Sequence, residues 1–154
     1  MSGAAQHEIE QAYAHPFGAQ IDRAALSQRL DAAGGWEAKS RLLVQLAREL
    51  PGLPEQEKND TNRVSGCEST VWLITRWQDG RLQVAADSDS RVIKGLLTLL
   101  LTAYHNRSAD EIQRFDIEAW LASLGLVRFL SASRGNGIRA IATRIIEASR
   151  QPAG

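Results

Sequence analysis

Cysteine is scarce in this sequence. Its 154 residues contain a single cysteine, Cys67. One thiol cannot form an intramolecular disulfide, and no CxxC pair or Cys-His cluster is present from which a zinc site could be built. The sequence therefore predicts neither a disulfide framework nor a structural metal site.

Long apolar runs and an excess of one charge are missing as well. The longest apolar stretch, residues 95–103, is far shorter than the ~20 residues that span a bilayer, and the N-terminus lacks the basic start and apolar core of a secretory signal. Eighteen basic side chains balance eighteen acidic ones, which disfavours a nucleic-acid-binding stripe. We expect a cytoplasmic protein that binds neither membrane nor nucleic acid and whose thiol stays reduced.

The first part of the chain predicts a tail followed by two helices. Residues 1–14 are expected to form a flexible tail, with ordered structure beginning at the turn residues 15–18 and one domain extending over residues 15–150. Asp22 is a candidate cap for a helix that reaches residue 32 and ends at Gly34-Gly35. Apolar residues recur at helical spacing over residues 36–50. The polar stretch 53–63 is expected to form an exposed connection.

The centre of the chain predicts a β-hairpin. Residues 71–77 are rich in β-branched and aromatic side chains, residues 81–84 alternate polar with apolar, and Asp79-Gly80 between them is a strong hairpin-turn signal. The continuous apolar start of the first strand indicates that this strand is covered on both faces.

The last third of the sequence predicts helices. Residues 92–104 are apolar nearly all round, apart from a narrow polar stripe, and should pack centrally against the sheet; the stripe consists of Arg91, Lys94, Thr98 and Thr102. Ser108 and Glu111 have capping-box spacing, residues 117–124 form a short helix ended by Gly125, and a final helix carries Ile138, Ile141 and Ile145 on one face. Helices around a small antiparallel sheet make an α+β fold.

Cys67 lies in the segment VSGCEST, residues 64–70, among small turn-forming residues. A buried cysteine acting as a small hydrophobe is one interpretation. The other is a displayed thiol: Gly66, between Ser65 and Cys67, makes a flexible and sterically thin tip that can enter another protein's active site. Composition alone favours the buried cysteine, and the polar approach to the segment, residues 54–62, narrows the difference between the two interpretations.

Catalysis by a Cys-His pair is disfavoured by the neighbours of the thiol. A thiol is nucleophilic as its thiolate, and the carboxylate of Glu68 would raise the pKa of Cys67. The three histidines, His7, His15 and His105, have no orienting partner that the sequence identifies, and we expect them to be surface groups. A thiol that only receives sulfur from a persulfide needs no base, because the partner supplies the environment and the acceptor contributes access.

Two further sets of residues have structural explanations. In residues 130–137 (LSASRGNG), Ser131 or Ser133 can cap the last helix and the glycines can form its entry turn, while Arg134 is a candidate cation near the thiol. No phosphate-binding loop is present, because the glycines lack the required spacing. Capping, solvation and core packing account for the remaining polar and aromatic candidates, which are Asp87, Asp89, Lys94 and Trp72.

Four blocks, in matching order and separation, resemble the SufE family of cysteine desulfuration accessory proteins. The blocks are residues 63–73 (RVSGCESTVWL), 86–97 (ADSDSRVIKGLL), 124–126 (LGL) and 130–137 (LSASRGNG). The resemblance extends over about residues 15–148, and residues 15–18 (HPFG) are most similar to the CsdE branch of the family. Residues 1–14 have no counterpart in it.

The resemblance implies a sulfur acceptor. In this family a cysteine desulfurase with pyridoxal phosphate (PLP), of the CsdA or SufS kind, takes sulfur from L-cysteine as a persulfide. The accessory protein docks, accepts the sulfur on a loop cysteine, often stimulates the desulfurase and passes the sulfur onward. Carried over to this chain, Cys67 is the acceptor, Glu68 shapes the loop or the partner contact, and Arg134 stabilises the thiolate or persulfide.

The family fold is similar to that of the IscU scaffolds, a sandwich of helices on a small antiparallel sheet. This chain lacks the three cysteines with which those scaffolds hold an iron–sulfur cluster, so cluster assembly on the chain itself is not expected. We expect a non-enzymatic persulfide carrier without a cofactor of its own, serving acceptors such as iron–sulfur cluster assembly. The alternatives are a regulatory module of a desulfurase or of a tRNA-modifying dehydratase that carries no sulfur, and a thiol hydrolase or transferase using His15 or His105.

Overall fold

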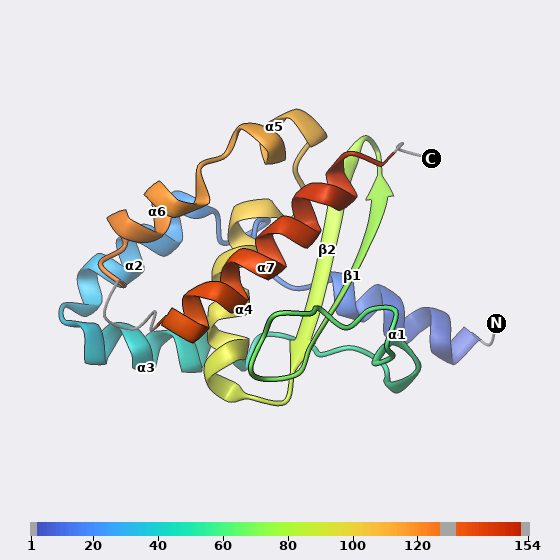
Figure 1. Cartoon of the computed structure of the whole chain (residues 1–154), viewed down its shortest axis with the longest axis horizontal. Coiled ribbons are helices and arrows are strands. Elements are labelled where there is room, and N and C mark those ends of the chain that lie inside the picture. Colours follow the sequence, from blue (N-terminus) through green and yellow to red (C-terminus); the bar gives the residue numbers. More distant parts are fainter. Residues whose placement is uncertain (1–2, 127–131, 152–154) are drawn as a thin grey trace.

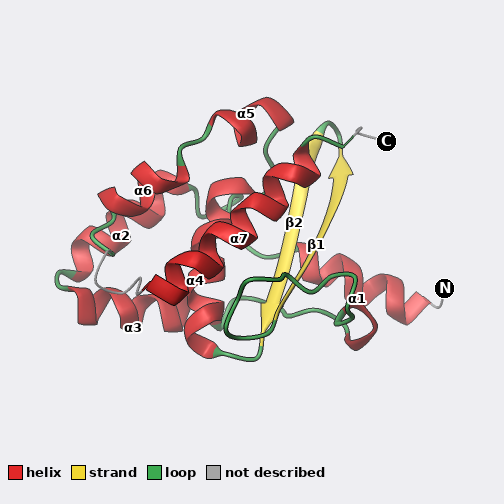
Figure 2. Cartoon of the chain, viewed as in Figure 1, coloured by secondary structure: helices red, strands yellow, loops and turns green. Residues whose placement is uncertain are grey.

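The computed structural model describes residues 3–126 and 132–151, without the side chains of residues 4 and 132–134. Within these residues the chain forms helices around one antiparallel hairpin (Figures 1 and 2), which confirms the predicted α+β class. The elements in chain order are α1 (Gly3–Tyr13), α2 (Arg23–Ala33), α3 (Trp36–Ala47), the 3₁₀ turn η1 (Glu55–Glu57), β1 (Val71–Gln78), β2 (Arg81–Ser88), α4 (Arg91–Tyr104), α5 (Ala109–Arg114), α6 (Ile117–Ser123) and α7 (Ala132–Ser149).

The hairpin forms where the sequence predicts it. Asp79 and Gly80 both have positive φ, 53° and 75°, as the two-residue turn of a right-handed twisted hairpin requires. One face of β1 presents Val71 and Leu73 to the main core, and the other presents Trp72 to a second cluster formed with α1. The prediction that the first strand is covered on both faces is therefore confirmed.

Flanking segments add hydrogen bonds to both edges of the hairpin. On the β1 edge, the Val64 amide donates to the Val71 carbonyl at 2.9 Å, and the Leu73 amide donates to the Asn62 carbonyl at 2.8 Å. On the β2 edge, the Leu82 amide donates to the Arg107 carbonyl at 2.8 Å. The bond between Val64 and Val71 closes the base of the intervening loop, residues 65–70, which contains Cys67.

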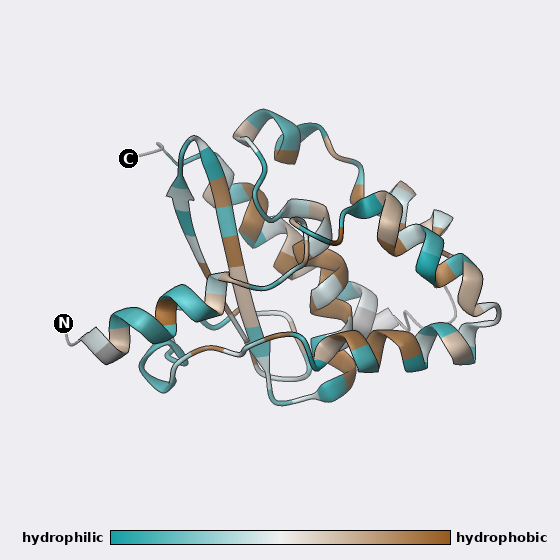
Figure 3. Cartoon of the chain, turned by 180° about the vertical axis from the view of Figure 1, so that it is seen from behind, coloured by the Kyte–Doolittle hydropathy of each residue, from teal (hydrophilic) through white to brown (hydrophobic). Residues whose placement is uncertain are grey.

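Helix α4 is the centre of the core, as predicted, and its apolar stretch lies in the middle of the molecule (Figure 3). Thr98 and Thr102 were expected in a polar stripe, yet both are fully buried. They tolerate burial because their hydroxyls donate to carbonyls one turn earlier, at 2.6 Å to Gly95 and 2.7 Å to Thr98. Gly95 permits a close approach of α3, since a Cβ there would lie 3.0 Å from the Leu43 carbonyl oxygen.

The N-terminal segment corrects one expectation. Ordered structure was expected to begin at residue 15, but residues 3–13 form α1, which packs against β2 (Figure 1). Ala12 and Tyr13 are buried, and the Arg76 guanidinium stacks 4.2 Å from the Tyr13 ring while pairing with Glu10 at 2.6 Å. The helical spacing of Ile9, Ala12 and Tyr13 is the sequence signal that could have predicted this helix.

Most predicted helix boundaries agree with the structure, and the last helix differs. The Asp22 carboxylate caps α2, and Ser108 with Glu111 forms the capping box of α5. Helix α7 begins at Ala132, so Gly135 and Gly137 lie inside the helix and not in an entry turn. Of the two predicted caps, Ser131 lies outside the described residues, and only the backbone of Ser133 is described.

Candidate functional site

The Cys67 loop, residues 65–70, rests against one face of α7. Gly66 has φ of +96°, a conformation that L side chains rarely adopt, and a Cβ there would lie 3.3 Å from the Ala140 side chain of α7. The glycine is therefore required both by the turn and by the close approach to the helix. The expectation of a free, flexible tip is corrected to a tight turn held on α7.

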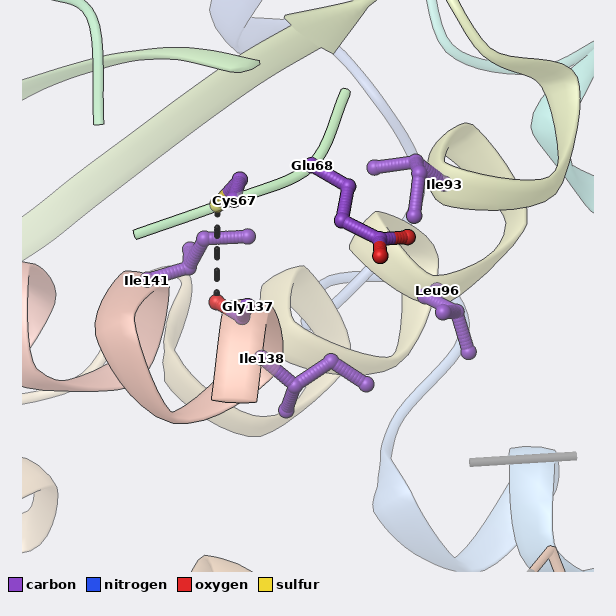
Figure 4. A pocket seen from close by; sticks show the side chains of 7 residues that line it. All are labelled: Cys67, Glu68, Ile93, Leu96, Gly137, Ile138 and Ile141. Atoms are coloured by element: carbon purple, nitrogen blue, oxygen red, sulfur yellow. Dashed lines mark hydrogen bonds between the residues drawn. The ribbon is translucent and has the colours of Figure 1, made fainter. Parts of the chain in front are cut away.

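The Cys67 side chain is half-buried and turned toward α7 (Figure 4). Its thiol donates to the Gly137 carbonyl oxygen, with 3.7 Å between Sγ and O. Beside the sulfur lies a cavity of about 20 Å³, which is enough for roughly one water-sized group. The residues that line it are Cys67, Glu68, Ile93, Leu96, Gly137, Ile138 and Ile141.

The electrostatics at the thiol favour its protonated form. Burial raises the pKa of Cys67 above its usual value, because desolvation penalises the thiolate. We expected Glu68 to be the cause of such a rise, whereas the structure attributes it to burial. Burial therefore disfavours the nucleophilic thiolate of Cys67 in this conformation.

Glu68 and Gly66 lie with Cys67 in the loop, while Arg134 does not complete the described site. The exposed Glu68 side chain extends toward α4 on the cavity side (Figure 4). The backbone of Arg134 belongs to α7, the helix that contacts the thiol, but its side chain lies outside the described residues. The expected role of Arg134 as a cation near the thiol stays a prediction.

An open groove borders the other side of the loop. It has a volume of about 530 Å³, and its lining residues are Asp60, Arg63, Val64, Ser65, Gly66 and Cys67. Cys67 thus lies between an apolar cavity toward the core and an open groove toward solvent.

The histidines are not placed to activate the thiol. His15 and His105 are buried, contrary to the expectation of surface groups, and their rings lie 4.2 Å apart. The Val84 amide donates to His105 Nδ1 at 3.0 Å, and His15 Nε2 lies 2.8 Å from the Val84 oxygen. Since both rings bond to β2 and neither lines the cavity, the Cys-His hydrolase interpretation has no support among the described residues.

Asp87 organises the elements around the loop. Its carboxylate is 5% exposed and pairs with Lys58 at 3.3 Å and Lys94 at 3.2 Å. The amides of Leu53 and Ser88 also donate to it. Burial acts to raise the pKa of Asp87, but these hydrogen bonds and Lys94 outweigh burial and lower it. Residues 87–90 offer several capping side chains in the sequence, and among them Ser90 caps α4 while Asp87 forms ion pairs.

Sequence reasoning missed the helix residues that complete the site. Ile138 and Ile141 had been assigned only to the apolar face of the last helix, and Gly137 to a turn. The signal for Gly137 was a small residue within an amphipathic pattern. A missing side chain at that position leaves room for another chain segment, but only the fold shows that this segment carries Cys67.

No cluster of three potential metal ligands occurs among the residues that the structure describes. Over the same part of the chain, no helix has the length and apolar character needed to cross a membrane. The thiol, the Glu68 carboxylate and apolar side chains of α4 and α7 line the cavity at the site.

Comparisons with known proteins identify the fold and the family of this chain. A solved solution structure of a hypothetical protein from Thermus thermophilus has the same fold, with a TM-score of 0.66, 19% identity and coverage of 81% of this chain and 93% of that one. The sulfur acceptor protein CsdE of Escherichia coli (strain K12) is 38% identical over 138 residues, which span 89% of this chain and 94% of that protein. The SufE family model, described as an Fe-S metabolism associated domain, matches residues 24–149. The chain belongs to the SufE family, with CsdE-like character.

Proposed function

We propose that this protein is a sulfur acceptor that works with a PLP-dependent cysteine desulfurase and carries the sulfur on Cys67. The supporting observation is the placement of Cys67, half-buried on a pinned loop between a cavity of about 20 Å³ and an open groove. Family membership and the similarity to a sulfur acceptor protein support the same function.

The transfer step is an exchange between two sulfur centres. The Cys67 thiolate attacks the outer sulfur of the donor persulfide, a new S–S bond forms on Cys67, and the donor S–S bond breaks. The donor cysteine leaves as a thiolate, so the number of sulfur atoms and electrons is conserved. The proton that Cys67 loses goes to the donor site, whose groups must favour the thiolate that burial disfavours in the free protein.

The cavity suits the carrier state that follows. An added sulfur atom is comparable in size with the water-sized group that the cavity can hold, and its walls include Ile93, Ile138 and Ile141. In the closed loop the outer sulfur is shielded from the thiols of the cytoplasm, which is the compartment that we propose for this protein. Opening toward the groove exposes the same sulfur to a docked protein.

The protein itself needs no cofactor for this exchange, and it has no turnover chemistry of its own. PLP belongs to the desulfurase that forms the donor persulfide. Docking places Cys67 in the partner's active site, stimulates the partner by removing its sulfur, and is followed by delivery to a downstream acceptor such as iron–sulfur cluster assembly.

The experiment is intact-mass analysis after incubation with the desulfurase and L-cysteine. We expect wild-type protein to gain a sulfur atom that a reductant removes, and Cys67→Ser to gain none. Wild type incubated without L-cysteine is the control for modification that does not come from the substrate. Equal modification of wild type and Cys67→Ser contradicts the proposal, and full stimulation of the desulfurase by Cys67→Ser indicates a regulatory module instead.

A further inference from the structure

Arg144 holds the base of the Cys67 loop from α7. Its guanidinium donates through Nη1 to the Arg63 carbonyl at 3.0 Å and through Nη2 to the Thr61 carbonyl at 2.6 Å. The acceptors are the backbone oxygens of the segment that leads into the loop. The contact therefore fixes main chain and does not depend on the side chains of that segment.

The same face of α7 contacts the loop at its tip. Gly137, Ala140, Ile141 and Arg144 follow the spacing of one helical face. Gly137 accepts from Cys67, Ala140 lies against Gly66, and Ile141 lines the cavity. One rigid helix thus positions both the tip of the loop and the segment 61–64 from which the loop departs.

The two attachments differ in strength. A thiol is a weak donor, and at 3.7 Å the bond from Cys67 to Gly137 is easily broken. A guanidinium makes charge-assisted bonds that are about twice as strong as neutral ones, and Arg144 makes two of them. At the other end of the loop the Ser88 hydroxyl donates to the Thr70 carbonyl at 2.8 Å. Opening therefore releases the tip before either end.

We propose that Arg144 is a positioning residue for sulfur transfer, which confines loop opening to residues 65–69 and returns Cys67 to the same cavity after each transfer. The inference rests on the proposed function, because it gives a role in that transfer to a residue that contacts neither thiol nor substrate. When Arg144 holds the base of the loop, Cys67 moves on a short segment whose two ends are anchored. Without Arg144, residues 61–64 move as well and the closed position of Cys67 is less populated.

The test measures how often the loop opens, without any desulfurase. The rate of Cys67 alkylation by iodoacetamide should rise about fivefold in Arg144→Ala. The two bonds of Arg144 are exposed, so water takes over most of them and the net loss is comparable with one ordinary hydrogen bond. Arg144→Lys retains one cationic donor and should give an intermediate rate. Arg139→Ala is the matched control, because Arg139 lies on α7 and pairs with Glu118, away from the loop, and this variant should react like wild type.

Amide hydrogen exchange separates positioning from a general effect on stability. In Arg144→Ala, exchange should become faster for the Val64 and Leu73 amides, which hold the segment to β1, and should stay unchanged in α4. An alkylation rate equal to that of Arg139→Ala overturns the proposal, as does faster exchange throughout the core. If Arg144→Ala does not fold, alkylation rates and amide hydrogen exchange are compared between Arg144→Lys and wild type, and this comparison tests the role of Arg144 instead.

Sulfur gain in the presence of desulfurase and L-cysteine distinguishes this inference from the function on which it rests. Wild type that gains no sulfur contradicts the proposed function whatever the alkylation rates are. Normal sulfur gain by wild type, together with an unchanged alkylation rate in Arg144→Ala, overturns only the role of Arg144.

Discussion

The Sγ atom of Cys67 lies 3.7 Å from the carbonyl oxygen of Gly137, a residue inside α7 that has no side chain to occupy the space beside the thiol. An ideal Cβ at Gly137 would lie 3.6 Å from that sulfur, which is an ordinary contact distance. The helix position can hold a methyl group next to the closed thiol, but not a larger side chain.

Replacement of Gly137 should therefore separate helix stability from loop position. Gly137→Ala should raise the free energy of unfolding by about 0.5–1 kcal/mol, because glycine is unfavourable inside a helix, and should leave Cys67 closed. Gly137→Leu should displace the loop and speed alkylation of Cys67 severalfold. Urea unfolding and alkylation kinetics measure the two effects, and equal alkylation rates for both variants would show that the loop does not depend on this space.

The raised pKa of Cys67 predicts the pH dependence of its reactivity. Alkylation proceeds through the thiolate, so the rate for folded protein should reach half its maximum at a higher pH than the rate for urea-unfolded protein. Because the unfolded state loses the thiol proton first as pH rises, the free energy of unfolding falls between the unfolded and folded pKa values of Cys67. Coincident pH profiles for the two states would contradict the burial of the thiol.

Asp87→Asn should destabilise the protein by about 3 kcal/mol, because it removes the buried carboxylate with which Lys58 and Lys94 form ion pairs. Both lysines keep partial contact with water, which places the loss at the low end for a broken buried pair. Asp89→Asn, at the exposed neighbouring position, is the matched control and should change stability by less than about 0.5 kcal/mol. Urea unfolding followed by tryptophan fluorescence measures both, and equal losses would contradict the role assigned to Asp87.

His105 predicts a loss of stability in acid. Burial, and next the nearby His15, lowers the pKa of His105 from 6.5 to about 3. Between these two pH values the unfolded chain binds a proton at His105 that the folded chain does not bind. The free energy of unfolding therefore falls as the pH drops from about 6.5 toward 3. His105→Asn should make that pH dependence shallower, whereas His7→Asn, on the exposed side of α1, should not. Unchanged slopes in His105→Asn would contradict this assignment.

Local sequence signals were sufficient wherever the structure depends on neighbouring residues. The turn at Asp79-Gly80, the Asp22 cap and the box formed by Ser108 and Glu111 all arise from backbone conformation and hydrogen bonds within a few residues. Local signals failed at Gly137, whose place inside α7 depends on the packing of the whole helix. They also failed for His15 and His105, which tertiary packing buries and which both bond to the same residue of β2.

The sequence by itself determined the α+β class, the hairpin and the SufE resemblance, and it singled out Cys67 as the candidate acceptor, because a single thiol and four ordered blocks can be read along the chain. Only the tertiary structure decided that Cys67 faces α7 beside a small apolar cavity and that burial raises its pKa. It also decided that Arg144 holds the base of the loop. These relationships join residues that are about 70 to 83 positions apart in the sequence, and contacts at such separations follow from the packing of α7 against the hairpin and not from local patterns.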